Sequence, residues 1–452
     1  MIQKELWADI HNTPQLSKET KTRLNSSEEL NKIYPEDRPV HEWYNFVLSF
    51  PPHLVRNYIR NFNICNNHQV LDPFCGTGTT TVECKKLGIP CVGIEAHPMA
   101  HFASNVKMDW TPDPNALMKH ANEITKSALG KLRSEGIEDI PILSTEQDKH
   151  QQLRSLPLEI SKLLLKDSIS PLPLHKTLVL LDCIEKQRDK RYYHHELLAL
   201  AKALVTSISN LRFGPEVGVG PTKSDSPVIA TWLSNTCSIA EDLSTLPNYK
   251  DVKAVVHLGD SREIQELLEP NSIDAVITSP PYPNEKDYTR TTRLESVLLG
   301  FINSKEELRK LKRGLIRSNT RCVYKDDDDD KWVREHPEIQ RIAKAIESRR
   351  IKLGKTSGFE RLYSKVTKQY FGGMSRHLAE LRPILRPGAK LAYVVGDQAS
   401  YLRIMIRTGQ LLADIAKSLG YELIGIDLFR TRLSTATKEH LREEVLVLRW
   451  PG

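Results

Sequence analysis

The stretch of residues 70–80 constrains the fold of this chain more than any other segment. A short apolar run leads into Asp72, and a Gly-x-Gly turn follows at Gly76 and Gly78. This order is typical of a buried strand that ends in a loop lying close to a ligand, because glycine has no Cβ to hold the backbone away. Residues 79–95 then predict a short helix followed by a second strand. The segment therefore predicts a βαβ unit with a ligand site at its glycine turn.

Polar side chains follow several of the predicted strands. Glu95 ends the second strand, Asp260 ends an apolar run that starts at residue 254, and Ser279 follows another apolar run. In a dinucleotide-type fold, an acid at the position of Glu95 binds ribose hydroxyls. Because the carboxyl ends of parallel strands line one edge of an open sheet, we expect these three side chains and Asp72 to face one cleft.

The last part of the chain predicts a different strand pairing. Residues 390–397 predict a strand, residues 402–419 a helix, and residues 421–429 and 444–448 two further strands. The link between the last two strands holds no long helix, so these strands should pair antiparallel. The outline is a parallel sheet that ends in an antiparallel pair.

Ser279-Pro280-Pro281-Tyr282 is the most specific motif in the chain. Two consecutive prolines donate no backbone hydrogen bond and hold the chain extended, so they suit a place where a rigid carbonyl points at a ligand. The Ser279 hydroxyl and the Pro280 carbonyl can accept the two hydrogens of an exocyclic amine, and the Tyr282 ring can stack on a base. A proline-stiffened turn with a core tyrosine would explain the motif alone, but not its combination with the glycine turn and the strand-end acids.

Together these residues resemble the S-adenosylmethionine-dependent amino-methyltransferases of DNA, which methylate N4 of cytosine or N6 of adenine. The resemblance implies an α/β, Rossmann-like methyltransferase fold with a mostly parallel seven-stranded sheet and an antiparallel terminal strand. It implies that Glu95 binds the ribose hydroxyls and Asp260 the adenine of the cofactor, and that the catalytic residues Ser279, Pro280, Pro281 and Tyr282 bind the target amine. Trp43 and Tyr44 lie in an aromatic segment, residues 43–51, that looks like the family's leading cofactor-binding motif. The residues implied to bind the methionine end of S-adenosylmethionine are Asp72, Pro73, Phe74, Gly76, Thr77, Gly78 and Thr79.

The residue at position 279 favours cytosine N4 over adenine N6 as the methylated atom. In this family the adenine enzymes usually carry Asp or Asn before Pro-Pro, whereas Ser is more typical of the cytosine N4 enzymes. The implied reaction is direct transfer to the amine of a flipped-out base, without a metal or a covalent enzyme intermediate. Adenine N6 methylation of DNA stays open as an alternative, as do methylation of an RNA base and a catalytically idle nucleic-acid-binding subunit.

The resemblance covers less than half of the chain, namely residues 41–105, 254–290 and 376–450. We predict a leader at residues 1–40 and a catalytic domain built from residues 41–110, 250–283 and 376–452. Residues 111–249 predict a helical insertion, because apolar residues recur at three- and four-residue spacing, with a glycine- and proline-rich loop at residues 211–227. Residues 284–375 predict a basic insertion that contacts DNA and recognises the target.

Positive charge is concentrated in one segment. Residues 284–376 carry 23 Lys and Arg against 14 Asp and Glu, an excess of nine positive charges, whereas the whole chain has a net charge of +7. Such an excess suits contact with the phosphates of double-stranded DNA. For the five aspartates at residues 326–330 we expect an exposed, poorly ordered loop, with a DNA-mimicking acidic clamp and an inserted epitope-like sequence as alternatives. The candidate DNA-binding residues are Lys310, Lys312, Arg313, Arg317, Arg321, Arg349 and Arg350.

The remaining composition narrows the class of protein. The seven cysteines form no CxxC pair and no Cys/His cluster with metal spacing, so we predict neither disulfides nor a metal site. No apolar run is long enough for a membrane span, and the first residues lack a signal-peptide pattern. These features predict an intracellular, cytoplasmic protein that meets DNA. A nuclease or defence-system partner is compatible with this prediction.

Overall fold

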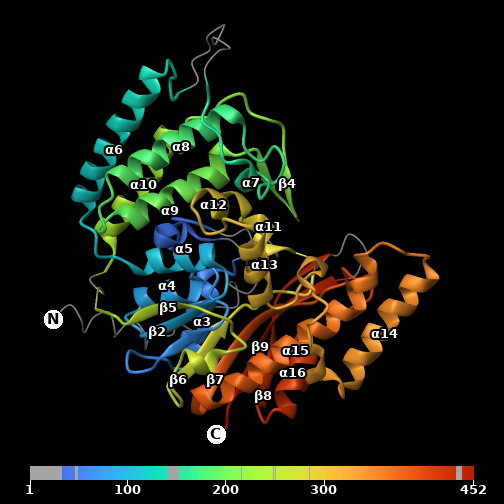
Figure 1. The fold of residues 1–452 in the computed structure, drawn as a ribbon. Coiled ribbons are helices and arrows are strands. Elements are labelled where there is room, and N and C mark those ends of the chain that lie inside the picture. The colour runs from blue at the N-terminus through green and yellow to red at the C-terminus, as the bar shows by residue number, and fades with distance from the viewer. Residues whose placement is uncertain are drawn as a thin grey trace, which may run out of the picture.

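A seven-stranded sheet lies at the centre of the computed structural model, which describes residues 33–45, 49–140, 152–214, 216–247, 249, 251–284, 286–433 and 440–452 (Figure 1). The strand order is β5-β2-β1-β6-β7-β9-β8. The strands are β1 (Val70–Asp72), β2 (Cys91–Glu95), β5 (Ala254–Leu258), β6 (Ile273–Thr278), β7 (Leu385–Gly396), β8 (Glu422–Leu433) and β9 (His440–Arg449). Most of the predicted leader, residues 1–32, lies outside the described residues.

Six strands of the sheet run in one direction and β9 runs against them. β1 pairs in parallel with β2 and β6, β2 with β5, and β6 with β7, whereas β9 is inserted antiparallel between β7 and β8. The Rossmann-like methyltransferase fold and the antiparallel pair at its end are therefore confirmed. The strand order reverses between β1 and β6, which is the point where open α/β sheets bind ligands.

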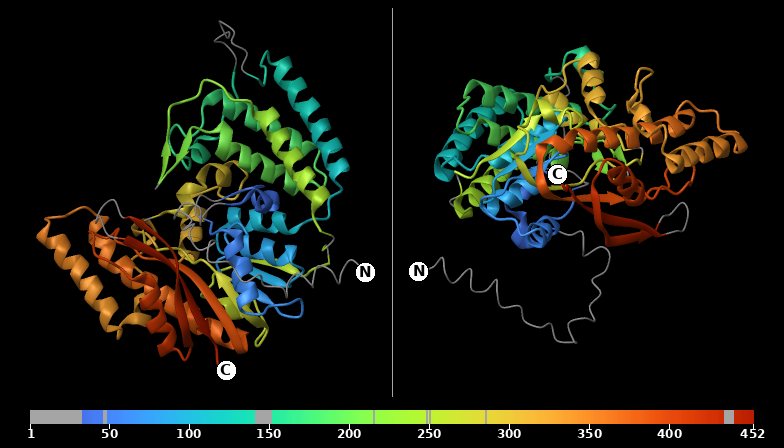
Figure 2. Two further views of the ribbon diagram at one scale, coloured as in Figure 1. Left: turned by 180° about the vertical axis from the view of Figure 1, so that it is seen from behind. Right: turned by 90° about the horizontal axis from the view of Figure 1, so that it is seen from below.

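Helices cover both faces of the sheet (Figures 1 and 2). Val70 and Ile277 pack with α3 on one face, and Leu71 and Val276 pack with α15 and α16 on the other. Because both faces are buried, these strands read as continuous apolar runs. The helices next to the sheet are α3 (Pro52–Asn61), α4 (Thr79–Lys86) and α5 (Pro98–Met108) on the first face, and α15 (Tyr363–Leu381) and α16 (Thr408–Ser418) on the second.

The segment predicted as a helical insertion forms a bundle beyond one end of the sheet (Figures 1 and 2). Its helices are α6 (Pro114–Ser134), α7 (Leu158–Ser161), α8 (Pro171–Lys186), α9 (Tyr193–Ala203) and α10 (Val228–Thr245), with a π-helical turn at Leu204–Ile208 after α9. The predicted loop at residues 211–227 is wrong at its start, because β3 (Leu211–Phe213) and β4 (Val217–Val219) form an antiparallel hairpin. Leu211 and Val217 are covered by neighbouring side chains, which is enough to hold a short pair. In the part of the chain that is described, no helix combines the length and the apolar character needed to cross a bilayer.

The segment predicted as a basic insertion packs against α15, and α14 projects from the body of the molecule (Figure 1). Its elements before α15 are α11 (Tyr288–Thr291), α12 (Arg293–Leu298), α13 (Lys305–Gly314), the 3₁₀ turn η7 (Asp329–Val333) and α14 (Pro337–Lys352). Apolar residues of α14 such as Ile342 and Ile346 are buried in the same cluster as Tyr370 of α15. This contact ties the insertion to the layer of helices behind the sheet.

The run of five aspartates is folded, so the expectation of a poorly ordered loop is wrong. Asp327 forms an ion pair with Arg317 at 2.8 Å and Asp329 forms one with Arg262 at 2.5 Å, and all four side chains are at most 7% exposed. The aspartates on either side, 326 and 328, are 61% and 70% exposed. Alternate carboxylates thus point inward and outward. The two buried aspartates are stabilised by Arg317 and Arg262, a contact that the sequence pattern does not reveal.

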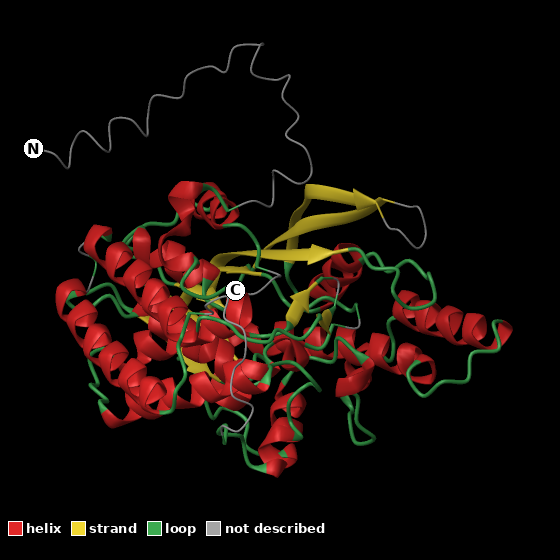
Figure 3. Ribbon diagram, turned by 90° about the horizontal axis from the view of Figure 1, so that it is seen from above, coloured by secondary structure: helices red, strands yellow, loops and turns green. Residues whose placement is uncertain are grey.

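Two other element boundaries differ from the prediction. The helix expected from residue 402 begins only at Thr408, because Leu402 and Arg403 have φ values of 54° and 62°, in the left-handed region that interrupts a helix. The strand expected from residue 390 starts at Leu385, because Gly388 adopts a φ of 87° and lets the strand continue through a register shift in its pairing with β6. Figure 3 shows the strands of the sheet with the helices around them.

Candidate active site

A cavity of about 270 Å³ lies at the carboxyl ends of the central strands. Its wall includes residues from the loops after β1, β2, β5 and β6, together with residues from the ends of β8 and β9. Residues 73–77 of the glycine turn and residues 279–282 of the Pro-Pro motif line this one cavity, although Asp72 and Ser279 are 207 positions apart in the sequence. The structure therefore brings the two most informative motifs of the sequence together.

Asp72 lies beneath the cavity and is absent from its wall. Its Oδ1 accepts a hydrogen bond from the Thr278 hydroxyl at 2.5 Å and another from the Phe74 backbone N–H at 3.1 Å. Burial raises the pKa of this carboxyl group to about 6. Asp72 thus joins the end of β1 to the end of β6 through Oδ1, while its Oδ2 has no hydrogen-bond partner among the described residues. Its direct contact with a ligand stays a prediction.

The two glycines of the turn serve different purposes. Gly76 has a φ of 54°, and a Cβ placed on it would meet no atom within 4 Å, so bare backbone faces the cavity there. Gly78 has a φ of 92°, and a Cβ there would lie 3.0 Å from the Thr81 hydroxyl and 3.2 Å from the Ser104 side chain. Gly78 is needed for packing at the start of α4, whereas Gly76 leaves room for a ligand.

Glu95 lies in the cavity wall at the end of β2. One carboxylate oxygen accepts the Gly76 N–H and the other accepts the His97 N–H, both at 2.7 Å. Burial raises the pKa of Glu95 to about 7. The carboxylate therefore has a fixed orientation next to the glycine turn, and each of its oxygens keeps a free lone pair for a further donor.

Asp260 takes part in an ion-pair chain at the edge of the cavity. Its neighbours Gly259 and Ser261 line the cavity, but Asp260 does not. The Arg262 guanidinium donates to Oδ2 of Asp260 at 2.5 Å and, through its other terminal nitrogen, to Asp329 at 2.5 Å. The acid predicted to bind the cofactor adenine is therefore linked through one arginine to the folded aspartate run of the basic insertion.

The Ser-Pro-Pro-Tyr residues all line the cavity. The Ser279 hydroxyl donates to the Val394 carbonyl at 3.2 Å, which leaves its oxygen lone pairs as acceptors. The Tyr282 ring lies against Gly396, where a Cβ would approach it to 2.9 Å. Burial and the neighbouring Glu443 raise the pKa of Tyr282, so its phenol stays neutral. This corner of the cavity offers the Ser279 oxygen as a fixed acceptor and an aromatic ring.

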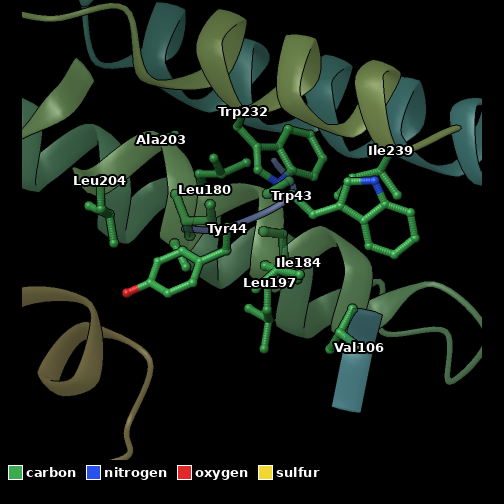
Figure 4. Packing of buried hydrophobic residues seen from close by; sticks show 14 of the residues in the cluster. Trp43, Tyr44, Val106, Leu180, Ile184, Leu197, Ala203, Leu204, Trp232 and Ile239 are labelled. Atoms are coloured by element: carbon green, nitrogen blue, oxygen red, sulfur yellow. The ribbon is translucent and has the colours of Figure 1, made fainter. Parts of the chain in front are cut away.

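Trp43 and Tyr44 are buried among the helices of the bundle and do not line the cavity (Figure 4). The Trp43 indole donates to Asp242 on α10 at 2.7 Å, and the Tyr44 hydroxyl donates to Glu295 on α12 at 2.5 Å. These hydrogen bonds anchor the segment to α10 and α12, and the contact of the two residues with the cofactor stays a prediction. Residues 49 and 50 of the same aromatic segment do line the cavity, and residues 46–48 lie outside the described part of the chain.

Several residues in the cavity wall were missed by the sequence reading. Arg430 of β8 and Glu443 of β9 are cross-strand neighbours, and the Arg430 Nε donates to Glu443 at 2.5 Å. The strands themselves were predicted, but the register that pairs these two residues depends on a bulge between Leu428 and Arg430. Other missed wall residues are His97, Tyr288, Asn319 and Cys322.

The candidate DNA-binding residues fall into two groups. Lys312, Arg313, Arg317 and Arg350 form ion pairs with nearby carboxylates, and Arg317 is only 5% exposed. A phosphate contact is therefore not available to Arg317, whose guanidinium is already occupied by Asp327. Among the described residues, Lys310, Arg321 and Arg349 are exposed and have no carboxylate partner.

The sheet order and the cavity define a protein with a Rossmann-like methyltransferase fold and a Ser-Pro-Pro-Tyr loop beside its glycine turn. Residues 3–105 match the N6_N4_Mtase family model, described as DNA methylase. The chain is 25% identical over 448 residues to the type II methyltransferase M.BsoBI of Geobacillus stearothermophilus. This alignment covers 89% of this chain and 83% of that protein. The chain is 23% identical over 453 residues to the type II methyltransferase M.AvaI of a Nostoc species, which covers 92% and 87%.

These comparisons confirm the resemblance to DNA amino-methyltransferases, and they support an enzymatic DNA methyltransferase of the N4/N6 family. A methyltransferase of this family implies S-adenosylmethionine as the methyl donor and DNA as the substrate. The crystal structure of TrmN from Thermus thermophilus aligns with 88% of this chain and 48% of its own length, at 11% identity and a TM-score of 0.26.

Proposed function

We propose that the protein transfers a methyl group from S-adenosylmethionine to N4 of a specific cytosine in double-stranded DNA. The observation that carries this proposal is the single cavity lined by both the glycine turn and Ser279-Pro280-Pro281-Tyr282. Adenine N6 is the alternative target atom. The two long relatives are named type II methyltransferases, which supports methylation at a defined recognition site and a nuclease as partner.

The cavity wall has the chemistry that S-adenosylmethionine requires. Bare backbone at Gly76 leaves space for the methionine end of the cofactor, and Glu95 has lone pairs left for ribose hydroxyls. Phe74, packed edge-on against His377, adds apolar surface to the same wall. We therefore assign cofactor binding to residues 73–77 and Glu95, with Asp260 at the edge of the site.

The residues around Ser279 would prepare the target amine for methylation. When bound, S-adenosylmethionine supplies an electrophilic methyl group. The lone pair of an exocyclic amine is delocalised into the base, and acceptors at the Ser279 oxygen and the Pro280 carbonyl would localise it on nitrogen. Held by these acceptors, the nitrogen would be oriented to take up the methyl group as it leaves the cofactor sulfur, and the proton lost from the amine would pass to solvent. Stacking on Tyr282 would offset part of the few kcal/mol that base flipping costs.

The test is transfer of labelled methyl groups to duplex DNA and to RNA, followed by nucleoside digestion and mass spectrometry. We expect N4-methylcytosine from DNA, and sequencing of the methylated DNA gives the recognition site. N6-methyladenine would establish the alternative target atom, and label in RNA alone would contradict the proposal.

The affinity for S-adenosylmethionine is expected to rise with pH through about 7. The pKa of Glu95 is raised to about 7, so its carboxyl group is neutral below that pH and ionised above it. An ionised carboxylate is the stronger acceptor for ribose hydroxyls and attracts the sulfonium charge. Calorimetry should show a fall in affinity of up to about tenfold per pH unit below the pKa. Glu95→Gln should bind S-adenosylmethionine weakly and without this pH dependence. The control Glu422→Gln, on the exposed edge strand, should keep the wild-type pH dependence. A pH profile of Glu95→Gln that runs parallel to that of wild type would contradict the assignment.

DNA affinity is expected to depend on the exposed cations without carboxylate partners, Lys310, Arg321 and Arg349. Log affinity falls as log salt rises, and each phosphate contact makes this slope steeper by about 0.9. The triple glutamine variant should therefore make the slope shallower by up to about 2.7. Fluorescence anisotropy with labelled duplex DNA at several salt concentrations measures this slope. Arg341→Gln, whose guanidinium already pairs with Glu338 on α14, is the matched control. An unchanged slope in the triple variant would place the DNA elsewhere.

A further inference from the structure

Arg430 stands in the cavity wall in a fixed orientation. It lines the same cavity as Ser279 and Tyr282, and its Nε donates to Glu443 across the β8–β9 pair at 2.5 Å. The two side chains are only 20% and 11% exposed. This ion pair fixes the orientation of the guanidinium group, because Arg430 and Glu443 lie directly opposite each other on two paired strands.

Tyr282 and Glu443 are packed together through Gly396. A Cβ at Gly396 would lie 2.9 Å from the Tyr282 ring and 3.4 Å from Cγ of Glu443. Any larger residue at this position would push one of the two side chains away. Glu443 therefore positions Arg430 relative to the ring on which the flipped base is expected to stack.

The two terminal nitrogens of Arg430 have no hydrogen-bond partner among the described residues. Because Arg430 lines the cavity and is 20% exposed, these nitrogens are free to donate to a ligand that enters it. A guanidinium presents its donors in a planar fork that suits two adjacent acceptors in one plane. The wall thus offers acceptors at Ser279 and Pro280 and a donor fork at Arg430.

The edge of cytosine carries the matching groups. Its N4 amine lies next to the acceptors N3 and O2, whereas adenine has the acceptor N1 followed by a C–H group. An arginine fork can therefore make two hydrogen bonds to cytosine and one to adenine. We propose that Arg430 binds N3 and O2 of the flipped cytosine and is the residue that selects cytosine over adenine. This inference rests on the proposed function and names the group that reads the base.

The experiment uses duplexes that carry the recognition site with either cytosine or 3-deazacytosine at the target position, since 3-deazacytosine replaces N3 by C–H. Wild type is expected to lose about 10- to 100-fold in kcat/KM on 3-deazacytosine, because one of the two hydrogen bonds is lost and a donor of Arg430 is left facing a C–H group. Arg430→Met should lose a similar factor on cytosine and show little further loss on 3-deazacytosine. If Arg430→Met keeps the full wild-type sensitivity to 3-deazacytosine, the proposal is overturned.

Two further variants keep this result interpretable. Arg430→Met combined with Glu443→Gln removes both partners of the ion pair, so that the Glu443 carboxylate, which would keep only Arg432 at 3.8 Å, is also neutralised; it should show the same insensitivity to 3-deazacytosine. Arg449→Met, which removes an exposed pair with Glu422 at the far end of β9, should behave as wild type. Calorimetric binding of S-adenosylmethionine by each variant checks that the fold is intact. A wild type that yields no N4-methylcytosine refutes the proposed function itself, whereas N4-methylcytosine with unchanged analogue sensitivity in the variants refutes only the role of Arg430.

Discussion

Replacing Ser279 with alanine is expected to lower kcat for DNA methylation by about 100-fold or more while leaving the affinity for S-adenosylmethionine nearly unchanged. The Ser279 hydroxyl is held by its hydrogen bond to the Val394 carbonyl, so its lone pairs are aimed before the amine arrives. Alanine keeps the backbone of the Pro-Pro loop and removes this one acceptor. The loss should therefore fall on the chemical step rather than on cofactor binding.

Single-turnover methylation at saturating DNA separates the chemical step from binding, and calorimetry reports the cofactor affinity. Ser238→Ala is the matched control, because this hydroxyl is exposed on α10 and bonds only to the carbonyl one helical turn earlier. A Ser279→Ala variant with wild-type single-turnover rate and weakened cofactor binding would show that Ser279 acts on the cofactor side of the cavity instead.

Replacing Gly372 with alanine is expected to lower the free energy of unfolding by about 3 kcal/mol, at the upper end of the usual cost of overpacking. A Cβ at Gly372 would lie 1.9 Å from the backbone oxygen of Asp329 and 2.4 Å from its carbonyl carbon. Neither backbone can yield easily, because α15 is buried against the sheet and Asp329 is held by Arg262. Urea denaturation followed by circular dichroism measures the change.

Gly130→Ala supplies the control for this substitution. Gly130 also lies inside a helix, α6, but a Cβ there would meet no atom within 4 Å. Alanine should therefore stabilise the protein there by up to about 1 kcal/mol through helix propensity alone. Equal stability of the Gly372→Ala and Gly130→Ala variants would mean that the aspartate run does not press on α15.

The fold could be predicted because its signals are local. Each central strand is a short apolar run, and each of the runs ending near Asp72, Glu95 and Ser279 is followed by a turn that marks its carboxyl end. Connections between parallel strands are restricted in handedness, so these runs leave few arrangements besides the observed sheet. The juxtaposition of the glycine turn with the Pro-Pro loop follows because both come after parallel strands, whose carboxyl ends line one edge of the sheet.

The differences concern residues whose partners cannot be identified from the local sequence pattern. Aromatic residues such as Trp43 suit a cofactor site and a core equally, and the hydrogen bond that ties Trp43 to the bundle goes to Asp242, 199 positions later. The aspartate run reads as a solvated loop because its partner Arg262 comes from another segment. Arg430 was missed because a bulge sets the register that places it opposite Glu443. In each case the decisive contact is a tertiary one that no local pattern encodes.

The link between Arg262 and Asp329 bears on the design of chimeric enzymes. A graft that exchanges residues 284–375 for the corresponding segment of another methyltransferase would leave Arg262 behind in the recipient. Unless the donor segment supplies a carboxylate at the place of Asp329 and glycine at the place of Gly372, Arg262 would lose one of its two carboxylates at the edge of the cavity. An exchange that tests the predicted role of residues 284–375 in target recognition should therefore treat these three residues as one transferable unit.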